Sequence, residues 1–248
     1  MDAFRRDFLK LAGTGLAGIA TSAVIAPGAR ADVTAPMPAV GTSSVYDVRT
    51  YGATGDGKTI DSPAINKAID DAAAGGGGTI LFPAGTYASY SIRLKSNIAL
   101  YLEQGATILA ASTSLEGTSG GYDHAEPRQP WESYQDYGHN HWHNSLIWGE
   151  SISNFAIRGP GRIWGKGLSR GISDKDLPRA EKSGAGNKAI ALKNCHNVIL
   201  RDFSILAGGH FGILATGVDN LTIDNLKIDT NRDGMDIDCC RNVRVSNC

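Results

Sequence analysis

The chain has 248 residues, with 24 lysines and arginines against 25 aspartates and glutamates, and a formal net charge of −1. This balance gives no reason to expect nucleic acid or an anionic membrane surface as a partner. The 31 glycines suit a fold with many tight turns, and the length is enough for one large domain.

The N-terminal segment has the pattern of an export signal. Arg5 and Arg6 precede a weakly apolar stretch, and an Ala-Arg-Ala cleavage site follows it and ends at Ala31. These features are typical of a bacterial twin-arginine signal. We therefore expect the twin-arginine export machinery as a partner, a signal peptide at 1–31, a linker at 32–44, and a periplasmic or secreted mature protein without a stable membrane span. An uncleaved signal anchor is the alternative.

A helix is expected near the start of the remaining domain, residues 45–248. Asp61 can cap it, Pro63 suits its first turn, and apolar residues follow at helical spacing up to Ala74. Glycines 75–78 then end the helix, and a strand follows. Because a solenoid needs a cover over its first open coil, we expect this helix to be the N-terminal cap.

The organising pattern of the domain is a repeat. Five segments begin with asparagine and continue with alternating apolar residues: Asn97, Asn154, Asn197, Asn220 and Asn242. An apolar residue stands seven positions before four of these asparagines: Ile147, Ile190, Ile213 and Met235. A period that settles at about 22 residues, with short period-2 strands, is the signature of a parallel β-solenoid.

We therefore predict an all-β fold, a right-handed parallel β-helix with an N-terminal capping helix. The asparagines are expected at turns, where this residue tolerates left-handed backbone and can stack its amide on the next coil. A leucine-rich repeat would need more leucines and usually a helical segment. A doubly wound α/β fold would need helices between the strands, and residues 200–220 show no convincing helical pattern.

Residues 112–145 interrupt the repeat and are rich in aromatic and histidine side chains. Long loops on a rigid solenoid often carry binding function, and aromatic faces suit the apolar faces of sugar rings. His139, His141 and His143 alternate and can in principle bind a metal. Loop packing or sugar contact is the interpretation that we favour.

The cysteines, Cys195, Cys239, Cys240 and Cys248, show no metal-ligand spacing. Cys239 and Cys240 are expected to point to opposite faces of a strand, and therefore not to bond to each other. We expect buried free thiols, with a disulfide in the exported protein as the alternative.

The strongest pointer to chemistry is the carboxylate-rich segment 229–238. Met235 and Ile237 are expected to point inward, which sends Asp236 and Asp238 to the outer face, while Asp233 opens the strand. Inverting glycosidases hold two carboxyl groups roughly 6.5–9.5 Å apart, a separation that one or two coils provide. Caps on backbone amides at turns and a calcium site are the alternative uses of such residues.

Several blocks of the chain match one family. They read VRTYGATGDG at 48–57, FPAGTY at 82–87, LIWG at 146–149, GPGRI at 159–163 and NRDGMD at 231–236. Over about residues 45–248 the chain resembles family 28 glycoside hydrolases, the polygalacturonase-like pectin hydrolases. The first block is shared with other β-helix enzymes, whereas the last block is the more specific one.

The resemblance implies inverting hydrolysis of galacturonosyl linkages in a pectic polysaccharide or oligosaccharide, without a metal or an organic cofactor. It places Asp233 among the carboxylates that activate water, with Asn231 beside it and Asp236 in support of the site. Arg232 stands where the family most often has threonine; it contacts a uronate carboxylate or is a solvated surface arginine. His210 can line the same cleft and bind substrate, or it packs at a turn.

In the family, a paired-Asp, a Gly-His-Gly and an Arg-x-Lys segment follow the Asn-x-Asp block, and none of them occurs between that block and Cys248. We therefore expect the N-terminal part of a longer enzyme, truncated at its C-terminal end and nearly inactive by itself. A β-helix polysaccharide lyase that uses calcium is a second hypothesis. A non-catalytic β-helix that binds polysaccharide is a third.

Overall fold

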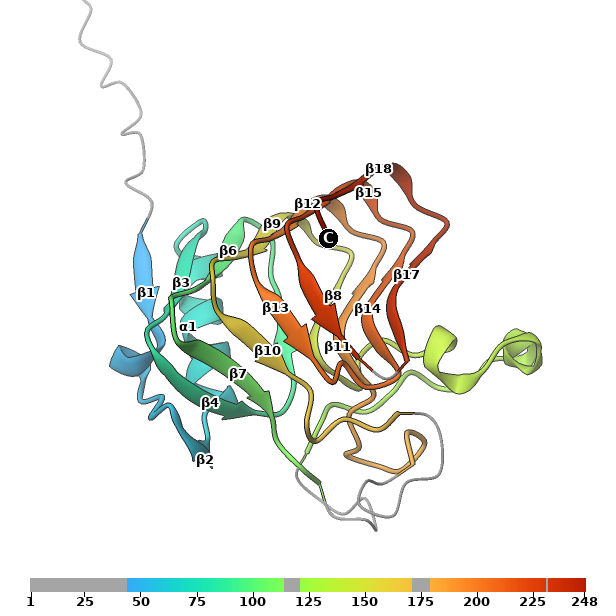
Figure 1. Cartoon of the computed structure of the whole chain (residues 1–248), viewed down its shortest axis with the longest axis horizontal. Coiled ribbons are helices and arrows are strands. Elements are labelled where there is room, and N and C mark those ends of the chain that lie inside the picture. The colour runs from blue at the N-terminus through green and yellow to red at the C-terminus, as the bar shows by residue number, and fades with distance from the viewer. Residues whose placement is uncertain (1–43, 114–120, 171–178, 231) are drawn as a thin grey trace, which may run out of the picture. The chain divides into compact units, whose positions relative to one another are not determined.

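The computed structural model describes residues 44–113, 121–170, 179–230 and 232–248. The predicted signal peptide, nearly all of the predicted linker and Asn231 lie outside these ranges. The described domain is a stack of coils, and parallel strands from successive coils pair side by side to form three sheets (Figure 1).

In the described part of the chain, the first sheet, sheet A, has seven strands: β1 (Val45–Asp47), β3 (Gly78–Phe82), β6 (Ile98–Leu102), β9 (Ser153–Arg158), β12 (His196–Arg201), β15 (Asp219–Asp224) and β18 (Arg241–Ser246). Sheet B has six: β2 (Asp56–Ile60), β4 (Gly85–Ser89), β7 (Ala106–Ala110), β10 (Arg162–Trp164), β13 (Ser204–Leu206) and β16 (Lys227–Asp229). Sheet C, which carries the carboxylate-rich motif, has five: β5 (Ile92–Arg93), β8 (Ser145–Glu150), β11 (Lys188–Lys193), β14 (Phe211–Thr216) and β17 (Asp233–Asp238).

The predicted asparagine column is confirmed. All five asparagines have a left-handed backbone, with φ between 54° and 63°. From Asn154 onward, each Nδ2 donates to the Oδ1 of the asparagine one coil earlier, and the four distances along the stack are 3.1, 2.8, 2.9 and 3.0 Å. The amide ladder therefore fixes the register at one corner of the solenoid.

The predicted inward column is confirmed as well. Ile147, Ile190, Ile213 and Met235 are register partners on β8, β11, β14 and β17. The three isoleucines are fully buried, and Met235 packs against the same core. Alternation along each strand then leaves the intervening side chains on the outer face of sheet C.

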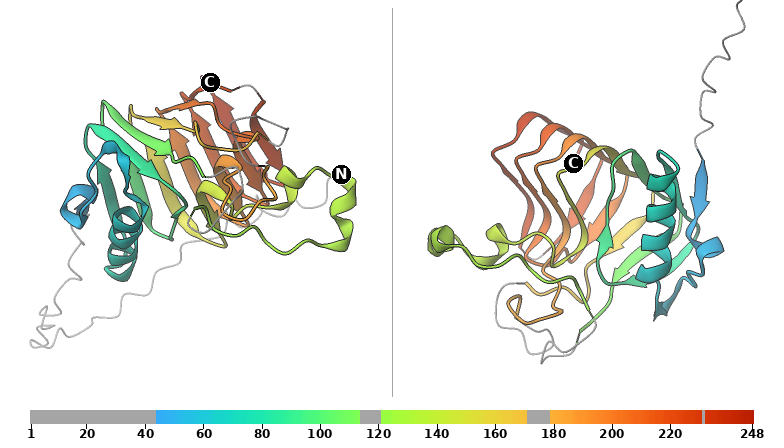
Figure 2. Two further views of the ribbon diagram at one scale, coloured as in Figure 1. Left: turned by 90° about the horizontal axis from the view of Figure 1, so that it is seen from below. Right: turned by 180° about the vertical axis from the view of Figure 1, so that it is seen from behind.

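The cap helix α1 (Ser62–Ala74) forms as predicted and buries Ile65, Ala68, Ile69 and Ala72 against the first strands. Figure 2 shows α1 at the β1–β3 end of the stack. The predicted capping role of the Asp61 side chain is wrong. Its buried carboxylate instead accepts hydrogen bonds from the backbone N–H groups of Thr54 and Gly55, so it braces the preceding loop.

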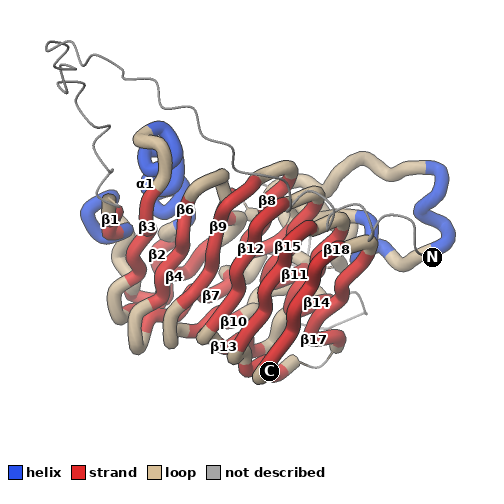
Figure 3. Tube along the Cα trace, turned by 90° about the horizontal axis from the view of Figure 1, so that it is seen from above, coloured by secondary structure: helices blue, strands red, loops and turns tan. Residues whose placement is uncertain are grey.

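The predicted insertion lies between β7 and β8, and Figure 3 shows it extending from the stack with short helical turns. Three 3₁₀ helices occur among the described residues: η1 (Val48–Tyr51), η2 (Pro130–Tyr134) and η3 (Tyr137–Asn140), the last two in the insertion. A second long connection, which was not predicted, joins β10 to β11. It makes the spacing between Asn154 and Asn197 about twice the repeat period, so the asparagine pattern by itself does not reveal it.

The cysteine prediction was correct in part. All four thiols are free, but only Cys195 is buried, whereas Cys239 and Cys248 are exposed and Cys240 is half-buried. Cys239 and Cys240 follow the end of β17 and lie in a turn rather than on a strand, with Cys239 at φ 52°. Within the described residues, no helix is both long and apolar enough to cross a membrane.

Candidate active site

The carboxylates of the motif lie along β17, at one edge of sheet C. Met235 and Ile237 pack against the core, and Asp236 and Asp238 alternate with them, as predicted. Asp233 is the first residue of the strand, and its side chain is 61% exposed. Asp233 is therefore accessible to water and to a bound ligand.

The insertion lies against the outer face of sheet C. Trp142 Nε1 donates to Thr216 Oγ1 of β14 at 3.1 Å. His143 Nε2 lies 2.8 Å from Glu150 Oε2 of β8, while the imidazole stacks on Trp148 with ring centroids 4.0 Å apart. These contacts place the insertion beside the motif, although the two are far apart in sequence.

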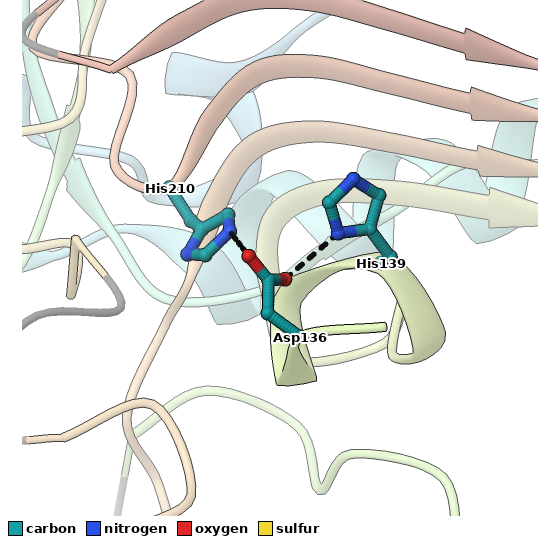
Figure 4. A group of neighbouring side chains, drawn as sticks. All are labelled: Asp136, His139 and His210. Atoms are coloured by element: carbon teal, nitrogen blue, oxygen red, sulfur yellow. Dashed lines mark hydrogen bonds and ion pairs between the residues drawn. The ribbon is translucent and has the colours of Figure 1, made fainter. Parts of the chain in front are cut away.

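Asp136 of the insertion joins two histidines from different parts of the chain (Figure 4). Its Oδ1 accepts from the Gly138 N–H at 3.1 Å and lies 2.8 Å from His139 Nδ1. Its Oδ2 lies 3.0 Å from Nε2 of His210, which directly precedes β14. Burial alone would raise the pKa of Asp136, but the His139 hydrogen bond and the nearby positive charge of Arg232 lower it below its usual value. Asp136 is therefore an ionised acceptor.

His139 connects this carboxylate to the motif, because its Nε2 lies 2.8 Å from Asp236 Oδ2. The pKa of Asp236 is raised above its ordinary value, chiefly by burial and by the charge of Asp238, with a further contribution from Asp233. His139 opposes this shift through its charge and its hydrogen bond. Asp236 therefore binds a proton more readily than an isolated aspartate does.

Arg232 is not the solvated surface arginine of one sequence hypothesis. Its side chain is 27% exposed, and Nη1 donates to the Arg170 carbonyl at 3.3 Å and lies 3.2 Å from His210 Nδ1. A guanidinium can only donate, so His210 Nδ1 is the acceptor and the ring proton is on Nε2, facing Asp136. Burial lowers the pKa of His210; the charges of Arg232 and Lys188 lower it further, while Asp136 opposes them. His210 is thus a buried neutral histidine packed at the turn.

Lys188 is a buried charge beside this network that sequence reasoning missed. It begins β11 and has no exposed surface, and its Nζ donates to Asn187 Oδ1 at 2.7 Å. Burial lowers its pKa from 10.5 to about 7, although the charges of Glu126 and Asp136 oppose the shift. A lysine at the start of a strand gives no signal of burial, because long cationic side chains there are usually solvated.

Two groups of three side chains among the described residues hold possible metal ligands within 4.8 Å of one another: Asp136 with His139 and His210, and Glu126 with His143 and Glu150. In the first group, the only lone pair that His210 offers is already turned to Arg232, so Nε2 cannot bind a cation without a tautomer change. A ligating histidine also normally donates its other N–H, which Arg232 cannot accept. In the second group, Lys193 Nζ neutralises Glu150 at 3.1 Å.

The alternating histidines do not converge on one ion. His141 is buried and points Nδ1 to the Tyr137 carbonyl at 2.9 Å, while His139 and His143 reach β17 and β8. The carboxylates of the motif form no such group of three ligands among the described residues.

The stacked parallel sheets define a right-handed parallel β-helix protein of the pectin-lyase-like type, as predicted. The chain belongs to the rhamnogalacturonase A/epimerase, pectate lyase-like family, whose model matches residues 45–248. The predicted resemblance to polygalacturonase-like enzymes is confirmed by this match and by the relatives.

Among the curated relatives, an exo-poly-α-D-galacturonosidase of Dickeya chrysanthemi is 33% identical over 146 residues, 56% of this chain and 23% of that protein. The plasmin and fibronectin-binding protein A of Streptococcus pneumoniae is 32% identical over 191 residues, 73% of this chain and 24% of that protein. The family 28 exopolygalacturonase structure from Yersinia enterocolitica matches with a TM-score of 0.64 and 25% identity, over 82% of this chain and 42% of that one. The chain therefore spans about a quarter of the length of these curated relatives.

Proposed function

We propose that this chain is the β-helix of an exported glycoside hydrolase that cleaves galacturonosyl linkages of pectic chains with inversion. The observation that carries the proposal is the exposed Asp233 at the start of β17, the edge strand of sheet C, three residues before Asp236. The galacturonosidase relative and the polygalacturonase fold support the substrate class. The Arg5–Arg6 pair supports export to the periplasm or the medium.

In the proposed reaction, the Asp233 carboxylate takes a proton from water, and the water oxygen bonds to the anomeric carbon as the glycosidic bond breaks. The leaving oxygen takes a proton from an acid on the opposite side of the linkage. Arg232 Nη2, 4.0 Å from Asp233 Oδ2, adds positive charge where a uronate would bind. We assign Asn231, which lies outside the described residues, to substrate binding on the family motif.

The insertion supplies aromatic surface for the sugar chain. Trp131 and Tyr134 of η2 are 62% and 88% exposed, which is unusual for large aromatic side chains without a partner molecule. Their faces suit the apolar faces of pyranose rings. His210, by contrast, is too buried to touch a polymer in this arrangement, and we give it a supporting role behind Arg232.

The test is release of reducing ends from polygalacturonate and from rhamnogalacturonan by the full-length gene product, with and without chelator. Asp233→Asn should reduce turnover by about 10²-fold or more, the usual minimum for loss of an acid/base group. Asp229→Asn, an exposed carboxylate on β16 in sheet B, is the matched control and should remain active. An unsaturated product that chelator abolishes would instead establish the lyase hypothesis.

A second candidate function is non-catalytic polysaccharide binding. The identity to the plasmin and fibronectin-binding protein, which covers more of this chain than the galacturonosidase match does, supports a binding role in general, and the exposed Trp131 and Tyr134 suit a sugar chain as the ligand. Affinity electrophoresis in gels that contain either polymer separates the two functions. A binder would be retarded without releasing reducing ends, and Asp233→Asn would change neither result.

A further inference from the structure

The two ends of the motif are connected through the insertion. Starting from Arg232, hydrogen bonds lead to His210, then to Asp136, then to His139, and from His139 to Asp236. The heavy-atom separations along this series are 3.2, 3.0, 2.8 and 2.8 Å. Arg232 and Asp236 stand on either side of Asp233 in the sequence, so the series links the two neighbours of the proposed catalytic carboxylate.

The positions of the protons follow from the chemistry of each group. Asp136 is ionised and can only accept, so the hydrogen in its contact with His139 belongs to Nδ1 of the imidazole. His139 Nε2 then faces an Asp236 oxygen at 2.8 Å. Two lone pairs cannot meet at that distance, so one further proton lies between them. Either His139 is an imidazolium beside a carboxylate, or Asp236 is a carboxylic acid that donates to the neutral ring.

We propose that Asp136 and His139 are positioning residues that hold this shared proton against Asp236 and keep its carboxyl group oriented beside Asp233. The inference rests on the proposed hydrolase function for its catalytic consequence. It extends the candidate site beyond the carboxylates of β17 to Asp136 and His139 of the insertion. In this arrangement Asp136 orients the His139 ring, and His139 in turn holds the Asp236 carboxyl group, as a third group orients the base beside a catalytic side chain.

The surroundings of Asp236 explain why a proton donor beside it is needed. The titratable groups that face it are Asp233 and Asp238 on its own strand and His139 from the insertion. Two negative neighbours disfavour a third carboxylate, and without His139 nothing positive in this set would compensate. His139 itself also meets the aromatic edges of His210 and Phe211, with centroids 6.2 and 4.7 Å away, which fixes its ring plane.

The kinetic test uses His139→Gln, which can still hydrogen-bond to Asp236 but cannot carry a proton, and Asp136→Asn, which removes the orienting charge. We expect kcat to fall by about ten- to a hundred-fold, the range for loss of a hydrogen bond to a charged group. Because His139 lowers the pKa of Asp236, the acidic limb of the pH profile should move to higher pH in His139→Gln. His124→Gln, an exposed histidine of the same insertion, should leave the profile unchanged. A uniform loss at all pH values, with the limb in place, would show a merely structural role and overturn the proposal.

A second measurement does not need activity. Nitrogen-15 spectra of the two rings in the full-length protein should show a proton on Nδ1 of His139, and a neutral His210 ring with its proton on Nε2. Asp136→Asn should disturb both signals, and Asp236→Asn that of His139. A His139 ring without a proton on Nδ1, or a His139 signal indifferent to Asp136→Asn, would refute the inference. If the wild-type protein releases nothing from either polymer, the proposed function fails, while these spectra still decide whether the network exists.

Discussion

Replacing Asn197 with alanine tests the amide ladder at its centre. The Asn197 Nδ2 donates to Asn154 at 2.8 Å, and its Oδ1 accepts from Asn220 at 2.9 Å. Each bond contributes about 0.5–1.5 kcal/mol, toward the low end here because the site is exposed. Alanine must also adopt φ 55°, which costs roughly 1–2 kcal/mol. We therefore expect the free energy of unfolding to fall by about 2–4 kcal/mol, far above the ±0.5 kcal/mol usual for surface positions.

The companion variant Asn197→Gly separates the two contributions, because glycine loses both hydrogen bonds but accepts the left-handed backbone. It should be destabilised by about 1–2 kcal/mol. Urea unfolding followed by circular dichroism gives both values, provided that the slopes with denaturant agree. A change below about 0.5 kcal/mol in the alanine variant, or equal losses in the two variants, would refute the reasoning.

Two further predictions concern a tight turn and a buried lysine. Gly77→Ala should destabilise the protein by roughly 2–4 kcal/mol, because a Cβ there would lie 2.3 Å from the Asn97 carbonyl oxygen. In the control Gly76→Ala, which is also at positive φ, a Cβ would meet nothing within 4 Å, so the loss should be only about 1 kcal/mol. Equal urea midpoints for the two variants would contradict this prediction. Lys188 has a folded pKa of about 7 against an ordinary 10.5, so the unfolded chain binds more protons across that window and stability should rise with pH from about 7 upward. Lys188→Met should remove this rise in thermal melts, and an unchanged slope would show that Lys188 is not the group responsible.

The repeat was predictable because solenoid stacking repeats a local rule. Asparagine recurs where a left-handed turn is needed, and Ile147, Ile190 and Ile213 recur where the core needs an apolar residue. Each coil meets only its neighbours, so a spacing in the sequence translates directly into a register. The outward direction of Asp236 follows from the same rule of alternation.

The surroundings of the motif could not be predicted in this way. Asp136 reaches His210 and, through His139, Asp236 only because the insertion folds back over sheet C, and no period describes that path. The Asp136–His139 spacing of three residues was the available signal, typical of a carboxylate that caps a turn. Asp61 is a case in which the position was predicted but the contact was not. It stands before α1 as expected, but its buried carboxylate accepts hydrogen bonds from an earlier loop.

The contacts of the insertion with sheet C also bear on the order of folding. Trp142 bonds to β14 and packs under Lys193 of β11, while His143 reaches β8 and His139 reaches β17. The insertion can make all of these contacts only after four successive coils have stacked. The insertion can therefore complete its contacts only when these coils are in place, and the fluorescence of the half-buried Trp142 is a probe of that last step of assembly.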